Sequence, residues 1–171
     1  MSTLEMTQAT TTRFEVQHVR VFIPKPFADV VRGIEAATGL FDAAKIRNRI
    51  ASGTAPGVVM DSIAAMAGES GLMRFATLDH GAILRLQGQD VDAVRFLIGH
   101  PLIAARMTRR AIGSALYAPL SLLVVADGQG SFLEYDRPST LLAQFHDLES
   151  ARIALDLDEK LAALIRSIAV G

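Results

Sequence analysis

Apolar and polar residues alternate in the first patterned stretch of the chain, residues 13–23. Every second side chain from Val19 to Ile23 falls on one side of an extended backbone, and the residues between them fall on the other. Because alternation rich in β-branched residues is typical of a strand, this stretch predicts a first strand that ends at Pro24. The polar, threonine-rich residues 1–12 before it are expected to be a flexible N-terminus.

The spacing then changes to that of a helix. Phe27, Val30 and Ile34 recur at intervals of three to four residues, which predicts a helix. We expect Gly39 to close it, since glycine is favoured just beyond a helix C-terminus.

Residues 40–68 form the least regular region of the chain. Asp42 suits the N-cap of a short helix through Ile50, and the turn-forming residues 52–56 end that helix. A second helix is expected to run up to Gly68. We predict that this helical pair is an insertion on a simpler fold.

Two pairs of short apolar runs predict β-hairpins. The first pair flanks the turn sequence Asp79-His80-Gly81, and the second flanks Asp127-Gly128. The predicted strands are residues 72–76 with 83–86, and residues 120–125 with 132–135.

Between the hairpins, Asp90 suits the N-cap of a helix through Ile98. The sequence Gly99-His100-Pro101 interrupts this helix, because the residue before a proline is pushed out of the α region. Proline is favourable in the first turn of a helix, so a new helix is expected to begin at Pro101.

Two helices are predicted near the C-terminus. Ser139 is expected to cap a short helix through Phe145. Apolar residues recur at helical spacing from Ala154 to Ile168 and predict a long amphipathic helix.

The predicted order of elements is β-α-(αα)-β-β-α-β-β-α. It indicates an α+β fold, with a curved antiparallel sheet and helices on one face. Residues 13–171 are expected to form a single domain.

Composition narrows the function classes. The chain has 171 residues and no cysteine, which excludes disulfides and thiolate metal sites. Its 17 basic and 18 acidic residues are mixed along the chain, so we expect no binding to nucleic acid, which needs a basic patch. The longest apolar runs are much shorter than the ~20 residues of a membrane helix. We therefore expect a cytoplasmic protein without membrane contact.

Common catalytic motifs are missing from the sequence. Gly128-Gln129-Gly130 lacks the third glycine of a dinucleotide fingerprint and lies in a predicted hairpin. The four histidines do not have metal-ligand spacing, so we expect no metal site. The sequence indicates no particular cofactor.

The first of three local features with chemical potential is Asp79-His80-Gly81. A carboxylate beside an imidazole can tune a general base. The alternative is an ordinary hairpin turn, which explains the aspartate and the glycine by backbone preferences alone, and we favour it.

The second feature is Gly99-His100-Pro101, followed by Arg106. A helix that begins at Pro101 directs free backbone N–H groups at the preceding residues, where an anion is favourable. His100 would lie at this helix start and could donate to a carboxylate or phosphate. In the alternative, His100 only occupies the capping position.

The third feature is Tyr135-Asp136-Arg137. These residues offer a phenolic donor, a carboxylate acceptor and a guanidinium fork. The alternative, which we favour, is an Asp–Arg pair that fixes the corner between a strand and a helix.

Three stretches of the chain resemble the domain-of-unknown-function family numbered 302. They are residues 96–104, residues 117–120 and residues 135–139, with Asp79-His80-Gly81-Ala82 as further support. The resemblance implies a compact α+β fold of the TATA-binding-protein type and a homodimer. It lends no reaction. Family members often have asparagine where this chain has His100, so His100 would keep a helix cap and add a titratable group.

Three functions stay open at this stage. The leading hypothesis is a homodimeric domain that binds a small ligand, with an anion as one candidate. The candidate binding residues are His80, His100, Arg106, Tyr135, Asp136 and Arg137. The second is an enzyme that uses His100 or His80 as general acid/base on an anionic substrate. The third is a structural or interaction module without a ligand pocket.

Overall fold

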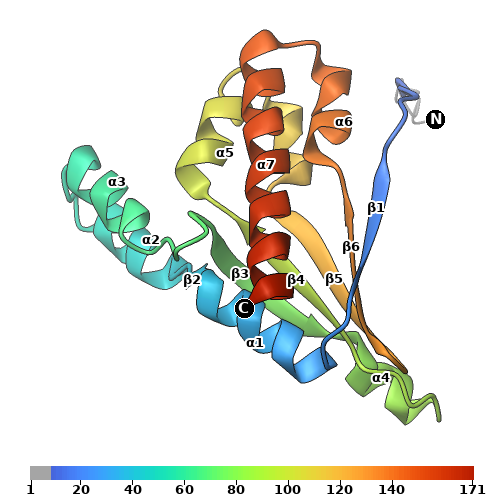
Figure 1. Ribbon diagram of the computed structural model, residues 1–171. Coiled ribbons are helices and arrows are strands. Elements are labelled where there is room, and N and C mark those ends of the chain that lie inside the picture. The colour runs from blue at the N-terminus through green and yellow to red at the C-terminus, as the bar shows by residue number, and fades with distance from the viewer. Residues whose placement is uncertain (1–8) are drawn as a thin grey trace, which may run out of the picture.

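Within residues 9–171, six strands form one sheet in the order β1-β6-β5-β4-β3-β2 (Figure 1). The protein is represented by a computed structural model that describes residues 9–171, so the predicted flexible terminus lies largely outside the described residues. Neighbouring strands are antiparallel, except that β2 pairs parallel to β3. The strands are β1 (His18–Ile23), β2 (Gly39–Leu40), β3 (Met73–Asp79), β4 (Ala93–Gly99), β5 (Leu120–Asp127) and β6 (Gly130–Asp136).

The helices connect these strands and cover mainly one face of the sheet. The longest, α7, lies across the strands in Figure 1, and α1 contacts both α7 and the strands β5 and β6. The α+β prediction is therefore confirmed. The α-helices are α1 (Phe27–Ala37), α2 (Ala43–Ala51), α3 (Pro56–Ala64), α4 (His80–Leu86), α5 (Pro101–Thr108), α6 (Pro138–Leu142) and α7 (Leu148–Val170). Two short 3-10 helices are η1 (Ile112–Tyr117) and η2 (Ala143–Phe145).

The core lies between the sheet and this helical layer. In β4, Val94, Phe96 and Ile98 are buried, and they pack in one cluster with residues of α1 and α7. Side chains of a strand alternate between its two faces, so the residues between them point to the opposite, uncovered face. Burial of each large apolar side chain stabilises the fold by about 1.5–3 kcal/mol, which makes this cluster the main source of stability.

Most predicted elements are present. The first strand and the helix after it are β1 and α1, and Asp42 caps α2 by accepting a hydrogen bond from the amide of Lys45. The second predicted hairpin is β5–β6, and α5 begins at Pro101. The C-terminal periodicity corresponds to α7.

The first predicted hairpin is wrong. Asp79 does not begin a turn between two strands; its side chain accepts a hydrogen bond from the amide of Ala82 and caps helix α4. Residues 83–86, predicted as the second strand, are part of this helix. The predicted helix before Ile98 is in fact strand β4, which pairs with β3. The segment is therefore strand–helix–strand, where we expected strand–strand–helix.

The start of the short helix near residue 139 also differs. Helix α6 begins at Pro138 with Arg137 in the N-cap position, where no side chain of the cap residue forms a capping bond. The amide of Ser139 donates instead to the carboxylate of Asp158, on α7, at 3.0 Å. This cap is supplied from another helix, so the local sequence could not reveal it.

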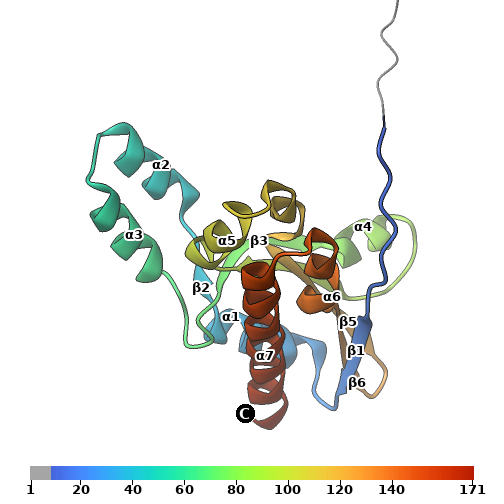
Figure 2. The same cartoon turned by 90° about the horizontal axis from the view of Figure 1, so that it is seen from above.

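Helices α2 and α3 form an arm that extends away from the rest of the molecule (Figure 2). The chain enters and leaves the arm at one narrow neck, where the amides of Gly39 and Gly68 both donate to the carbonyl oxygen of Leu72. Ile46, Val59 and Ile63 of the arm form a small buried cluster with Met73, which belongs to β3, so the arm packs against the edge of the sheet. That the arm is an insertion on a simpler fold stays a prediction.

Among residues 9–171, no helix combines the length and the apolar character needed to cross a membrane.

Candidate functional site

The link between β4 and α5 contains His100, one of the predicted site residues, and holds it in a fixed position. His100 occupies the N-cap of α5, where its ring Nδ1 accepts a hydrogen bond from the amide of Leu102 at 3.2 Å. Pro101 follows in the first helical turn, where its missing N–H costs nothing. The predicted capping role of His100 is thus present in the structure.

This hydrogen bond determines which ring nitrogen carries the proton when the imidazole is neutral. A nitrogen that accepts cannot carry the proton, so the neutral ring holds its hydrogen on Nε2. Partial burial lowers the pKa of His100 from 6.5, and the positive charge of Lys160 lowers it further. His100 is therefore a neutral hydrogen-bond donor at physiological pH.

A small apolar cavity lies beneath α5, directly beside His100. Its volume is about 90 Å³. Its walls come from β3, β4, α5, the η1–β5 connection and α7, and are formed by Phe75, Gly99, His100, Pro101, Ile103, Ala104, Met107, Tyr117, Ala118, Pro119, Leu120 and Leu157. An apolar cavity of about 150 Å³ binds benzene, so this smaller cavity has room for a short aliphatic chain and is too small for a benzene ring.

Lys160 brings a positive charge to this region from α7. Its Nζ lies close to Gly71, where an added Cβ would be 3.1 Å from the ammonium nitrogen. Within residues 9–171, Lys160 makes no ion pair. The region beside His100 therefore combines an apolar cavity, a neutral N–H donor and an uncompensated cation.

Aromatic side chains cover the outer wall of the cavity. The ring of Phe14 meets the ring of Tyr117 edge-on at 6.4 Å, and Tyr117 in turn lies 6.2 Å from Phe145. Gln17 holds the N-terminal segment in place, because its carbonyl accepts from the amide of Arg137 at 2.9 Å.

The other predicted candidates lie elsewhere. Arg106 points away from the cavity and pairs with Glu149 at 3.7 Å on the outer surface. His80 begins α4, at the far end of the β3–β4 pair from His100. Since Asp79 pairs with Val94, six residues before His100, the two histidines are about 20 Å apart along the strand. They cannot act on the same small substrate.

The residues Tyr135, Asp136 and Arg137 do not form a single site. Tyr135 pairs with Val19 and faces the helical layer, where burial raises its pKa. Asp136 faces the uncovered side, and Arg137 is exposed at the start of α6. Asp136 pairs with His18 and not with Arg137, so the favoured Asp–Arg pair is wrong.

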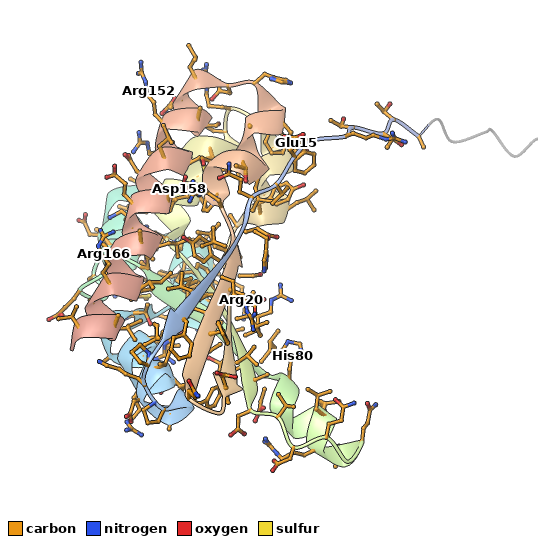
Figure 3. The ribbon with its side chains drawn as sticks, turned by 45° about the vertical axis from the view of Figure 1, so that its right-hand side comes forward. Glu15, Arg20, His80, Arg152, Asp158 and Arg166 are labelled. Atoms are coloured by element: carbon orange, nitrogen blue, oxygen red, sulfur yellow. The ribbon has the colours of Figure 1, made fainter. Side chains whose placement is uncertain are left out.

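A wider groove lies on the uncovered face of the sheet, with a volume of about 500 Å³. His80 and Asp136 line it, together with His18 and Arg95, which the sequence analysis did not single out. Figure 3 shows Arg20 and His80 on this side of the sheet, away from α7 with its Arg152, Asp158 and Arg166.

His18 lies between two carboxylates in this groove. Its Nδ1 is 2.9 Å from Asp136 and its Nε2 is 3.2 Å from Glu134. These two bonds raise the pKa of His18, the one to Asp136 most. Because β1 and β6 are more than a hundred residues apart in sequence, only the register of the sheet brings this cluster together.

Comparison with known proteins agrees with this fold. The family described as "Domain of unknown function DUF302" matches residues 49–168, which are 120 of the 171 residues. The chain is also similar to the crystal structure of an uncharacterized conserved DUF302 protein from Bacillus stearothermophilus, with a TM-score of 0.61 at 16% sequence identity. That similarity covers 88% of this chain and 97% of the other. No curated protein matches the sequence.

Proposed function

This chain belongs to the DUF302 family of domains of unknown function, and we propose that it binds a small organic acid in the cavity beneath α5. The observation that carries the proposal is the position of this apolar cavity beside His100 and near the unpaired ammonium of Lys160. The family itself supplies no reaction, so the proposal depends on the chemistry of these residues.

The cavity favours a ligand with an apolar body. Its walls present mainly aliphatic and aromatic carbon, and burial of apolar surface contributes about 25 cal/mol per Å². A polar group on the ligand would need a partner at the edge of the cavity, since an unpaired buried polar group is costly.

The polar end of the ligand is expected to accept hydrogen bonds. Neutral His100 offers a donor at Nε2, and Lys160 adds a positive charge. Both favour a carboxylate over a cationic or donor group. Butyrate is a suitable probe, with 1-butanol as its neutral analogue.

Titration of the isotope-labelled protein with butyrate, followed by NMR, tests this site. We expect shifts concentrated in the amides of residues 99–120. Ala104→Phe should fill the cavity and abolish the shifts, whereas Ala64→Phe, at an exposed position of α3, should leave them unchanged. Lys160→Met should weaken the binding of butyrate severalfold and leave the binding of 1-butanol unaffected.

Equal butyrate binding by wild type and Ala104→Phe would refute the cavity as the site. Equal weakening of both probes by Lys160→Met would refute the role of its charge. Native mass spectrometry of the protein as isolated adds an independent readout, because a retained ligand appears as additional mass.

We also infer that the chain forms a homodimer, supported by the outer edge of β1. Within the described part of the chain, β1 ends the sheet and pairs only with β6. An unpaired strand edge is a template for another strand, and a second copy of β1 would continue the sheet antiparallel across a twofold axis.

The bond from the Arg137 amide to Gln17 shows which amides face outward. Since backbone groups alternate in direction along a strand, the N–H groups of His18, Arg20 and Phe22 point away from β6. Arg20→Pro removes one outward donor, and Arg20→Ala is the matched control that keeps it. Sedimentation equilibrium should give a dimer for wild type and for Arg20→Ala, and a monomer for Arg20→Pro. A monomeric wild type would refute the inference.

A further inference from the structure

The groove on the uncovered face of the sheet has a floor of apolar side chains. Ala93 pairs with Val125 across β4 and β5, and Leu123 lies next to them on the same face. Leu84, on α4, forms a wall at one side. This floor suits a flat hydrocarbon surface that lies along the strands.

The two carboxylates of the groove have partners within the protein, whereas one of its cations has no carboxylate partner among the residues that the structure describes. Glu134 binds Arg20 at 2.9 Å and also contacts His18. His18 holds Asp136 as well. Both carboxylates of the groove therefore already have cationic or hydrogen-bonding partners from β1.

Arg95 is the exception. It is half-buried on β4, and its Nε and Nη2 donate to the hydroxyl of Ser121 at 3.1 and 2.7 Å. In the part of the chain that the structure describes, it makes no ion pair with a carboxylate. A guanidinium held at its Nε/Nη2 edge by a neutral hydroxyl keeps its full charge, and its Nη1/Nη2 edge is left for an external anion.

We propose that this groove is a second ligand site, which binds a flat aromatic carboxylate with its ring system on Leu123 and Val125 and its carboxylate on Arg95. The site is independent of the cavity beneath α5, because it lies on the uncovered face of the sheet and has different walls. It is also larger, about 500 Å³ against about 90 Å³, so a two-ring acid fits the groove and exceeds the cavity.

In the proposed pose, binding of the ligand carboxylate depends on the charge of Arg95. Leu78, on β3, lies directly opposite Arg95 and is 42% exposed. A glutamate at this position would give Arg95 an internal carboxylate partner, because directly opposed side chains on one sheet face are within reach of each other. Such a partner would compete with the ligand while leaving Arg95 itself unchanged.

Isothermal titration of the full chain with 2-naphthoate tests the site. We expect Arg95→Met to weaken binding at least tenfold, and Arg166→Met, on the outer side of α7, to have no effect. The neutral probe 2-naphthol should bind wild type and Arg95→Met alike. Leu78→Glu should also lose 2-naphthoate, which keeps the test decisive if Arg95→Met does not fold.

Three results would overturn the proposal. One is equal affinity of 2-naphthoate for wild type and Arg95→Met. Another is loss of 2-naphthoate binding in Ala104→Phe, which would place the acid beneath α5. A change of oligomeric mass in Arg95→Met would equally count against it, because a second copy of the chain would then cover the groove.

Discussion

Substitution of His100 separates its role as a helix cap from its role as a titratable group. In His100→Ala, the amide of Leu102 loses its side-chain partner. Loss of an N-cap costs typically ~1 kcal/mol. In a domain of this size, that corresponds to a fall in Tm of roughly 2–4 °C. His100→Asn should recover most of this loss, because asparagine is among the best N-cap residues.

The two variants should also differ from wild type in their dependence on pH. The pKa of His100 is lower in the folded protein than its unfolded value of 6.5, so the folded state binds fewer protons. Stability is therefore fully present above about pH 6.5 and is lost as the pH falls toward the folded pKa. Asparagine does not titrate, so His100→Asn should lack this component.

Urea unfolding followed by far-UV circular dichroism measures these differences, since the chain has no tryptophan to report by fluorescence. The midpoint should shift while the slope m stays constant. At about pH 8, His100→Ala should be the least stable of the three proteins. At about pH 5, wild type should have lost stability relative to His100→Asn. The same pH dependence in all three proteins would refute the titration of His100, and equal stability of the two variants would refute the cap.

Two further predictions concern the neck of the arm and the uncovered sheet face. Gly39→Ala should destabilise the fold severely, because its Cβ would lie 1.6 Å from the carbonyl oxygen of Met66; Gly57→Ala, whose Cβ has open space, should be neutral or slightly stabilising in thermal unfolding. His18→Gln should lower stability at acid pH and have little effect at alkaline pH. The folded pKa of His18 is raised, so its contribution is complete below its unfolded value of 6.5 and disappears as the pH rises through the folded value. Urea midpoints of both proteins across this range check the sign, and a constant difference would contradict it.

The sequence predicts this structure correctly where an element depends only on residues close to it in the chain. Asp42 has the residue type of an N-cap and caps α2, and Pro101 begins α5 as its preference for the first turn predicts. The apolar periodicity of the sequence predicts α7 correctly, because one face of this helix packs against the core over about six turns. These features need no information from distant parts of the chain.

The errors occur where tertiary contacts override a local pattern. Residues 91–98 carry apolar side chains at both helical and strand spacing, and the choice is made by pairing of β4 with β3 and β5 on both sides. Gly81 fits a turn equally well, but its lack of a side chain serves close packing: a Cβ there would lie 2.5 Å from the carbonyl oxygen of Val91. Only the folded backbone distinguishes these alternatives.

The candidate sites show the same difference between features set by neighbouring residues and features set by tertiary contacts. His100 is predictable because its role depends on Pro101, its immediate neighbour. The groove is not predictable, since Arg95 and His18 come from strands whose neighbours are set by the sheet order. A sequence read alone has no signal that places these two residues on one face.

The neck at Gly39 and Gly68 has a consequence for how this chain can vary in length. Because one carbonyl oxygen accepts from both glycine amides, the chain returns after the arm to almost the point where it left. A change of length in the loop between α2 and α3, residues 52–55, leaves the route of the backbone through the sheet unchanged. The outer end of the arm can therefore diverge, while its inner residues keep their packing against Met73 of β3.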